Sequence, residues 1–341
     1  MDERPPYCVI TTIQEPTPSL HRLSELYREY NSRIIVIGDQ KGPSRFELEG
    51  ADFFPLNVQE KLDFSLARAI PTGHYSRKNL GYLIAIQQGA GCIYETDDDN
   101  EPASGWRPRA LEVEARKIDP APWVNVYRFF SDQAIWPRGF PLNLIRESNA
   151  YRIEDQTSQV TVTAPIQQGL SDYSPDVDAI WRLLFDHEFS FDPGPSVWLP
   201  PGSWCPFNSQ SSWWWPVAYP LLYLPSYCSF RMTDIWRGFV AQRCLWELGF
   251  GLVFHSPEVI QCRNTHNLLD DFRDETPGYL NNARIADLLT DAELKPGMNA
   301  VGENILRCYE ILTKEGLIAV AEMPLLNAWL NDLDALSKNS I

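Results

Sequence analysis

Apolar and polar positions follow two different periods in the first hundred residues of the chain. Short apolar or β-branched runs predict buried strands at residues 7–13, 33–37, 52–56 and 91–95. Between these runs, apolar residues recur at helical spacing and predict helices at residues 20–30, 60–69 and 77–88. Strands that alternate with helices are typical of parallel βαβ units, so we expect an α/β fold in which helices flank a sheet.

After residue 105 the pattern becomes irregular. Residues 106–168 are rich in β-forming residues, and residues 193–225 are dense in Pro, Trp, Ser and Gly, which is typical of long ordered loops. We expect a helix at 175–184, a strand at 226–232, a helix from 233 or 234 to 248 and a strand at 251–255. The Leu- and Ala-rich segments predict a helical C-terminal appendage at residues 279–289, 301–314 and 317–336.

Charge and composition narrow the classes of protein. The chain holds 45 Asp and Glu against 29 Lys and Arg, a formal net charge of −16, which argues against binding to nucleic acid or to an anionic membrane surface. Its 7 cysteines are scattered without a CxxC pair, a pattern typical of reduced thiols in a cytosolic protein. No apolar segment approaches the roughly 18 residues of a membrane span. We therefore expect a cytoplasmic protein with no membrane span and no nucleic-acid partner.

The sharpest local feature is an acidic cluster, Asp97-Asp98-Asp99, directly after the predicted strand at 91–95. In parallel sheets ligands bind beyond the carboxyl ends of the strands, and Asp39 follows another strand end in the same way. Adjacent carboxylates repel one another, so the cluster costs stability unless a cation neutralises it. Asp97 and Asp99 could reach one Mg²⁺ or Mn²⁺ ion, which can stabilise a diphosphate as a leaving group. The alternative is a solvated acidic turn.

Two cations, Arg77 and Lys78, lie at the start of the helix predicted before this cluster. Cations at a helix N-terminus oppose the helix dipole, so they are poor choices for helix stability. They suit an anion site, where backbone amides and side-chain charges converge on a phosphate. The alternative is a solvated basic turn.

Several of these segments resemble the STELLO family of glycosyltransferases. The likeness lies in IGDQK at 37–41, RKNLGYLIAIQ at 77–87 and IYETDDDN at 93–100. Later segments agree with it at residues 168–170, 175–180, 207–210, 234–238, 242–243 and 245–247. The likeness runs in order from about residue 7 to 271 and leaves out the helical tail after about residue 276. A weaker likeness is to the reversibly glycosylated polypeptides, which are UDP-sugar mutases with a related acidic motif.

The STELLO resemblance implies a GT-A fold with a Rossmann-like mixed sheet. A nucleotide-sugar half would occupy about residues 1–105, an acceptor half about 106–275, and a C-terminal helical region 276–341. The resemblance also implies a divalent cofactor, Mn²⁺ or Mg²⁺, held by Asp97 and Asp99. By the same analogy the nucleotide and the donor sugar would be bound by Thr11, Thr12, Asp39, Lys41, Arg77, Lys78, Asp97 and Asp98.

Three further expectations concern the second half. Inverting GT-A enzymes often place their base at the start of a helix, so the resemblance makes Asp234, where a predicted strand meets a helix, the candidate catalytic base. A carboxylate there can deprotonate an acceptor hydroxyl; the alternative is an ordinary helix N-cap. GT-A enzymes often complete their metal site with a late histidine, so His255 is expected as a metal ligand, with His266 as a substitute and a core-edge histidine as the alternative. The expected acceptor residues are Trp213, Trp214 and Asn208. The two tryptophans belong to an aromatic group that could form a platform for a sugar or could equally be core material: Trp204, Phe207, Trp213, Trp214, Trp215 and Tyr219.

The leading hypothesis is a metal-dependent glycosyltransferase that moves a sugar from a nucleotide-diphosphate sugar, with UDP favoured, to a hydroxyl of a carbohydrate or glycan acceptor. Asp234 favours inverting displacement. The alternatives are a UDP-sugar mutase, which needs no acceptor groove, and a non-catalytic scaffold with a GT-A-like fold. Plant members of the family carry a membrane anchor for the Golgi, and no segment of this sequence predicts one, so we do not expect their cellular role to transfer.

Overall fold

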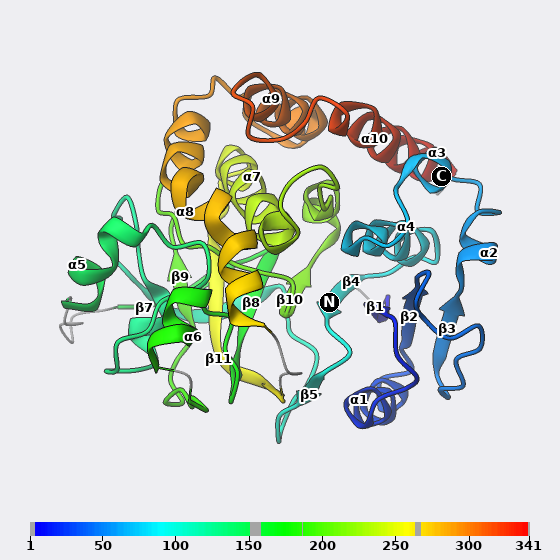
Figure 1. Cartoon of the computed structure of the whole chain (residues 1–341), viewed down its shortest axis with the longest axis horizontal. Helices are drawn as coiled ribbons and strands as arrows, with labels where there is room; N and C mark the ends of the chain where they lie inside the picture. Colours follow the sequence, from blue (N-terminus) through cyan, green and yellow to red (C-terminus); the bar gives the residue numbers. More distant parts are fainter. Residues whose placement is uncertain (1–3, 151–157, 186, 263–266, 340–341) are drawn as a thin grey trace.

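The first half of the fold is a parallel sheet, as the sequence predicts. The computed structural model describes residues 4–150, 158–185, 187–262 and 267–339 of the 341-residue chain. In these residues one mixed sheet of 11 strands is flanked by helices (Figure 1). Its first strands run in the order β3-β2-β1-β4, all parallel: β1 (Pro6–Thr12), β2 (Arg33–Gly38), β3 (Ala51–Phe54) and β4 (Cys92–Thr96).

The second half of the sheet is mixed. Strand β10 (Ser211–Trp214) is antiparallel to both β4 and β8 (Ile166–Asp172), and it joins the two halves. Strand β11 (Leu252–Gln261) is parallel to β8. The remaining strands are β5 (Asn100–Pro102), β6 (Glu112–Lys117), β7 (Gln159–Thr163) and β9 (Val197–Leu199). A large mixed sheet with flanking helices confirms the α/β class and is consistent with a GT-A-like fold.

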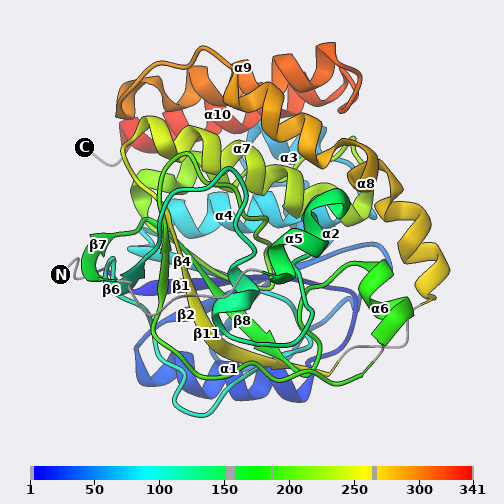
Figure 2. The same ribbon diagram turned by 90° about the vertical axis from the view of Figure 1, so that its left-hand side faces the viewer.

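Helices cover both faces of the sheet in layers (Figures 1 and 2). Helix α1 (Pro18–Glu29) lies on one face, and α4 (Lys78–Gln87) and α7 (Thr233–Glu247) lie on the other. Helix α4 approaches the sheet closely because Gly81 has no side chain: a Cβ there would lie 2.5 Å from Val9 Cγ1. Outside α4 and α7 lie α8 (Leu268–Thr290), α9 (Val301–Lys314) and α10 (Glu322–Asn339).

Several predicted elements differ from the observed ones. The helix expected at 60–69 forms only at its end, as α3 (Ser65–Ala69), and a separate short helix, α2 (Leu56–Gln59), precedes the expected range. The helix expected at 175–184 begins later, as α6 (Ala179–Phe185). The strand expected at 226–232 is wrong, because its first amides bond to a side chain of α10 instead of to a neighbouring strand. The other elements are α5 (Ile145–Ala150) and the 3₁₀ helices η1 (Tyr75–Arg77), η2 (Val126–Phe129), η3 (Leu142–Leu144), η4 (Pro216–Leu222), η5 (Phe230–Met232) and η6 (Met298–Ala300).

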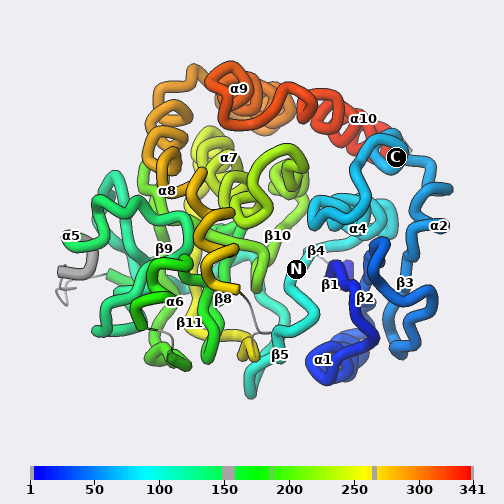
Figure 3. Tube along the Cα trace, viewed as in Figure 1, coloured from blue at the N-terminus to red at the C-terminus, as the bar shows by residue number. Residues whose placement is uncertain are grey.

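The C-terminal helices share the core of the sheet domain. Helix α8 runs without a break across the expected boundary at residue 275, and α10 ends beside α3 (Figure 3). The Asp332 carboxylate accepts the backbone amides of Ser65 and Leu66 at 2.8 and 2.9 Å, which caps α3. Trp329 is fully buried in the main apolar cluster. Within the described ranges, no helix combines the length and the apolar character that a membrane crossing requires.

Candidate functional site

A cleft of about 580 Å³ opens at the carboxyl ends of β1, β2 and β4. This volume is typical of small-molecule sites. Residues that line it from the first half of the chain include Thr11, Thr12, Asp39, Lys41, Arg77, Asp97, Asp98 and Asp99. Residues that line it from the second half include Arg138, Asp176, Arg182, Phe230, Arg231 and Asp234. The structure therefore brings together most of the residues expected to bind the nucleotide, the metal and the acceptor hydroxyl.

The Asp39 carboxylate shapes the cleft wall. It follows β2 and accepts the backbone amides of Gln40, Gly73 and His74 at 2.7, 2.8 and 2.9 Å. These bonds hold the turn at residues 73–74 against the end of the sheet. Asp39 lines the cleft as expected, and its side chain also fixes the turn that leads into α4.

The acidic cluster after β4 has a different partner for each carboxylate. Asp97 accepts from the Tyr75 hydroxyl at 3.2 Å and lies 3.4 Å from Lys78 Nζ. Asp98 accepts the hydroxyl of Thr12, and Asp99 accepts Gln261 Nε2 with both oxygens at 3.1 Å. Burial raises the pKa of Asp97 to about 7, with Lys78 opposing and the neighbouring aspartates adding to the shift. Burial also raises the pKa of Asp98. A bound cation would relieve this crowding of like charges.

The acidic cluster suits a metal ion that is bound partly by carboxylates of the protein and partly by phosphate oxygens of a substrate. Asp97 and Asp99 line the same cleft. In the part of the chain that the structure describes, no group of three or more His, Cys, Asp or Glu side chains could hold a metal on its own. Magnesium commonly takes one or two carboxylates and completes its shell with water and substrate phosphates. The carboxylate pair therefore fits a divalent ion that binds together with a diphosphate.

Of the three cations expected to bind the donor, Lys41 and Arg77 line the cleft and Lys78 does not. Lys78 is fully buried, outside the cleft lining, and donates to the Tyr75 hydroxyl at 2.9 Å and the Thr96 carbonyl at 2.8 Å. It supports the acidic cluster from beneath. Arg77 lines the cleft and is 2% exposed; it donates to Gln59 Oε1 at 2.7 Å, and its Nη2 has no hydrogen-bond partner among the described residues. Burial lowers the pKa of Arg77, and Asp39 opposes this shift.

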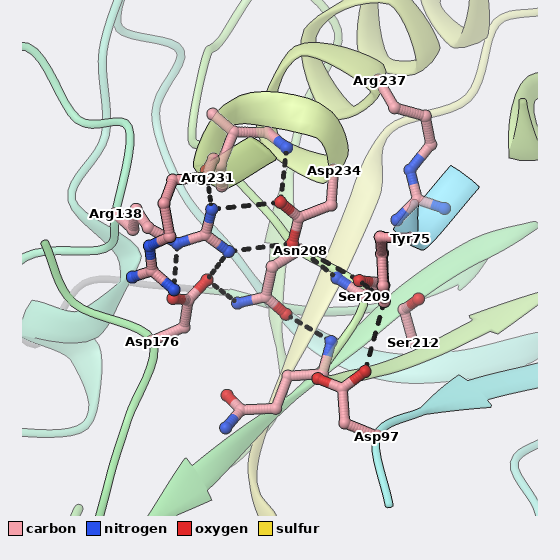
Figure 4. Close-up of polar contacts among 12 residues, drawn as sticks. Tyr75, Asp97, Arg138, Asp176, Asn208, Ser209, Ser212, Arg231, Asp234 and Arg237 are labelled. Atoms are coloured by element: carbon pink, nitrogen blue, oxygen red, sulfur yellow. Dashed lines mark hydrogen bonds and ion pairs between the residues drawn. The ribbon is translucent and has the colours of Figure 1, made fainter. Parts of the chain in front are cut away.

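Asp234 lies in the first turn of α7, buried beneath the second half of the cleft. Its two oxygens accept Nη1 and Nη2 of Arg138 at 3.0 and 2.9 Å (Figure 4). Ser209 adds its amide at 3.3 Å and its hydroxyl at 3.4 Å. Burial alone would raise the pKa of Asp234, but the adjacent Arg138 guanidinium holds it below its ordinary value. The carboxylate is ionised at neutral pH and firmly oriented.

Sequence reasoning missed Arg138 and Asp176. Arg138 bridges two carboxylates, because its Nε and Nη2 also donate to Asp176 at 2.7 and 2.9 Å (Figure 4). The signal was present, since Arg138 is the lone charge in the apolar segment 134–142. Its partners stand 38 and 96 positions along the chain, so no local pattern joins them.

A hydrogen-bonded chain of side chains connects the two halves of the cleft. The Tyr75 hydroxyl contacts Asp97, and it also bonds to the Ser209 hydroxyl, which donates to Asp234 (Figure 4). Burial raises the pKa of Tyr75 well above its ordinary value, so the phenol stays protonated. Tyr75 is a third residue that the sequence did not single out.

Besides Lys78, four expected site residues lie outside the cleft lining. Trp213 and Trp214 are fully buried in β10, where their indole nitrogens donate to Glu258 and Glu95 at 3.0 Å each, so the expected acceptor platform is core. Asn208 supports the site from behind by donating to Asp176 at 2.7 Å. The fourth, His255, was expected to bind the metal and is also absent from the cleft lining.

His255 is not brought to the acidic cluster. It is 1% exposed, and its ring nitrogens bond to the Ser196 hydroxyl at 2.7 Å and to Gln167 Oε1 at 2.9 Å. Burial lowers its pKa well below the ordinary value, so it is a neutral core histidine. The substitute, His266, lies outside the described residues.

Comparison with known proteins supports the resemblance. Residues 231–339 match the family of STELLO glycosyltransferases, so the expectation that the helical tail lies outside the likeness is wrong. The chain is 29% identical over 347 residues to "Probable glycosyltransferase STELLO2" and 28% identical over 351 residues to "Probable glycosyltransferase STELLO1", both from Arabidopsis thaliana. The alignments cover 96% and 97% of this chain but 44% of each relative, so the chain spans less than half of their length. The chain is therefore similar to the STELLO glycosyltransferases over nearly its whole length, as its motifs indicated.

Proposed function

We propose that the chain is a metal-dependent glycosyltransferase that uses a nucleotide-diphosphate sugar, with UDP favoured as the nucleotide. One observation carries the proposal: a single cleft is lined both by the strand-end residues Asp39, Asp97 and Asp99 and by Asp234. This is the combination that a donor site and an acceptor-activating carboxylate require. The names of the related plant proteins point the same way.

On this proposal the donor lies along the carboxyl ends of the parallel strands. The nucleoside would contact Thr11, Thr12 and the wall held by Asp39, with Arg77 and Lys41 as the nearby cations. Asp97 and Asp99 would hold Mn²⁺ or Mg²⁺, which supplies positive charge to the leaving diphosphate. Lys78 keeps Asp97 oriented through its bonds to the Tyr75 hydroxyl and the Thr96 carbonyl.

Transfer would be a direct displacement at the anomeric carbon. The acceptor hydroxyl forms a bond to that carbon, the bond to the diphosphate breaks, and the hydroxyl proton passes to Asp234, with inversion of configuration. Arg138 keeps Asp234 ionised but also makes it a weak base, since an effective base has a pKa near the working pH. An acceptor that replaces one bond from Arg138 would raise the basicity of Asp234 at the moment of transfer.

The second half of the cleft favours a transferase over a mutase. The side chains of Phe230, Arg231 and Arg182 line it beyond Asp234, and Phe230 is 56% exposed. An aromatic face beside charged groups suits a second sugar. These residues, and not the buried Trp213 and Trp214, would form the acceptor side.

A panel of nucleotide sugars with Mn²⁺ tests the proposal. The measurement is release of nucleoside diphosphate with and without glycan acceptors, with products separated by chromatography. We expect acceptor-dependent release from one class of donor. Ring isomers of the donor formed without acceptor would indicate the mutase, and absence of both turnover and binding across the panel would indicate the scaffold. A matched control is Asp132→Asn, which changes an exposed aspartate outside the cleft lining.

A further inference from the structure

Glu322, the first residue of α10, is a fully buried carboxylate far along the chain from the cleft residues. It accepts the Tyr223 hydroxyl and the backbone amides of Ser226 and Tyr227 at 2.9 and 2.6 Å. Burial raises its pKa, and these donors oppose the shift. A buried carboxylate that collects several donors fixes the segment that carries them, because each lost bond leaves a desolvated group unpaired. Glu322 therefore holds residues 223–227.

The start of α4 holds the same segment from the opposite side. Asn79 donates to the Leu224 carbonyl and accepts the Leu224 amide, both at 2.8 Å. The hydroxyls of Ser76 and Ser226 are 2.7 Å apart and buried. Residues 223–227 are thus clamped between α4 and α10.

The segments on both sides of this clamp connect it to residues that line the cleft. On the α4 side, the Ser76 hydroxyl bonds to His74 Nδ1 at 2.8 Å, and the His74 amide donates to Asp39 at 2.9 Å. On the other side, the chain continues from Tyr227 to the cleft-lining Phe230 and then to α7. Phe230 packs edge-on against His74, with ring centroids 5.9 Å apart. The clamp therefore lies where the donor wall and the acceptor wall of the cleft meet.

We infer that Glu322 is a positioning residue of the cleft: it sets the position of residues 223–231 relative to the turn at 73–75, and so the spacing between the two cleft walls. The effect of Glu322 on catalysis rests on the proposed function. If Glu322 sets the spacing of the cleft walls, α10 is part of the catalytic unit. The match of the STELLO family model through residue 339 agrees with this role.

The chain offers a matched control on the same helix. Asp332 of α10 is also a buried carboxylate that accepts two backbone amides, but those amides belong to α3. Replacing either carboxylate with its amide, as Glu322→Gln or Asp332→Asn, removes the same kind of bond. If Glu322 serves stability alone, the two variants should behave alike.

Hydrogen–deuterium exchange and donor calorimetry with Mn²⁺ and a UDP-sugar test the inference. For Glu322→Gln we expect exchange at residues 226–231 to rise roughly tenfold, the worth of one charge-assisted hydrogen bond, and donor affinity to fall by about the same factor. Asp332→Asn should raise exchange only at residues 65–66 and leave donor affinity unchanged. Glu322→Gln with lowered stability but unchanged exchange at 226–231 would overturn the inference, and so would equal effects of the two variants.

Two provisions keep the test decisive. If Glu322→Gln does not fold, Tyr223→Phe removes one donor to the same carboxylate and should give a smaller change in the same direction. If the wild-type protein binds no nucleotide sugar, the proposed function fails, but exchange at residues 226–231 still decides whether Glu322 positions the cleft wall.

Discussion

The two halves of the sheet supply the cleft in different ways. In the first half, Thr12 ends one parallel strand and Asp39 and Asp97 directly follow two others, and their neighbours in space are the ends of adjacent strands. In the second half, Arg138 comes from a loop and Asp234 from the first turn of a helix, and they meet in a buried ion pair. The first half of the cleft is formed by strand ends, as in any parallel sheet. The second half is formed by residues that are far apart in the sequence and meet only in the folded protein.

This difference shows which parts of a ligand site can be predicted from sequence patterns alone. A parallel sheet places its strand ends along one edge, so recognising the strands already places the ligand site. A lone charge in an apolar segment, such as Arg138, can indicate a buried ion pair but not its partners, and the pair is stable only if its geometry is complete. We expect the two halves to respond differently to substitution: the first through ligand binding, the second through transfer and stability.

The largest expected effect is on transfer. Asp234→Asn removes the carboxylate that takes the acceptor proton, so kcat should fall by about 10²–10⁴-fold while donor affinity changes by less than about threefold. Single-turnover kinetics and calorimetry measure the two quantities separately. If the Asp234→Asn variant transfers sugar at the wild-type rate, Asp234 is not the catalytic base, and the two halves of the cleft do not differ in the way proposed.

The next effect is on stability. Arg138→Met leaves Asp176 and Asp234 buried without their shared cation, and the free energy of unfolding should fall by about 3–5 kcal/mol. In the first half, Arg33→Met breaks an exposed pair with Asp52 and should cost less than about 1 kcal/mol. Urea denaturation measures both. Similar costs for the two variants would contradict the contrast.

A smaller effect should follow from the tyrosine that connects the halves. Tyr75→Phe removes the hydroxyl between Asp97 and Ser209, and kcat/KM should fall roughly tenfold, the worth of one hydrogen bond to a charged group. Tyr82→Phe is the matched control, since its buried hydroxyl bonds to Glu95 in the core. If both variants lower kcat/KM equally, Tyr75 does not couple the halves.

The smallest effect on the cleft is expected at the tryptophans. Trp213→Phe leaves a smaller aromatic ring in the core and removes the indole bond to Glu258, so the free energy of unfolding should fall by about 1–3 kcal/mol while acceptor KM stays unchanged. Phe230→Ala should raise acceptor KM without lowering stability, because Phe230 is more than half exposed. The reverse result would restore the tryptophans as the acceptor platform.

The sequence predicts the first half of the site well because its signals are local. The strand before Asp97 and the helix after Arg77 are both visible as periodic patterns, and the structure contains them as β4 and α4. The second half depends on contacts that no window of sequence contains. Trp213 is a residue type common in sugar-binding sites, but it lies in a strand that is buried on both faces. Residues 226–232 lack a strand partner because Glu322 binds their first amides.

The most direct test of the central claim is calorimetric titration of a UDP-sugar, with and without Mn²⁺, into the wild-type protein and into the Asp97→Asn, Asp99→Asn double variant. We predict Mn²⁺-dependent binding to the wild type and a loss of about 100-fold or more in the double variant, because replacing even the residues that orient metal ligands typically costs about 10–100-fold. The Asp132→Asn control should bind like the wild type. Equal affinity with and without Mn²⁺, or an unchanged affinity in the double variant, would contradict a donor site built on these two carboxylates.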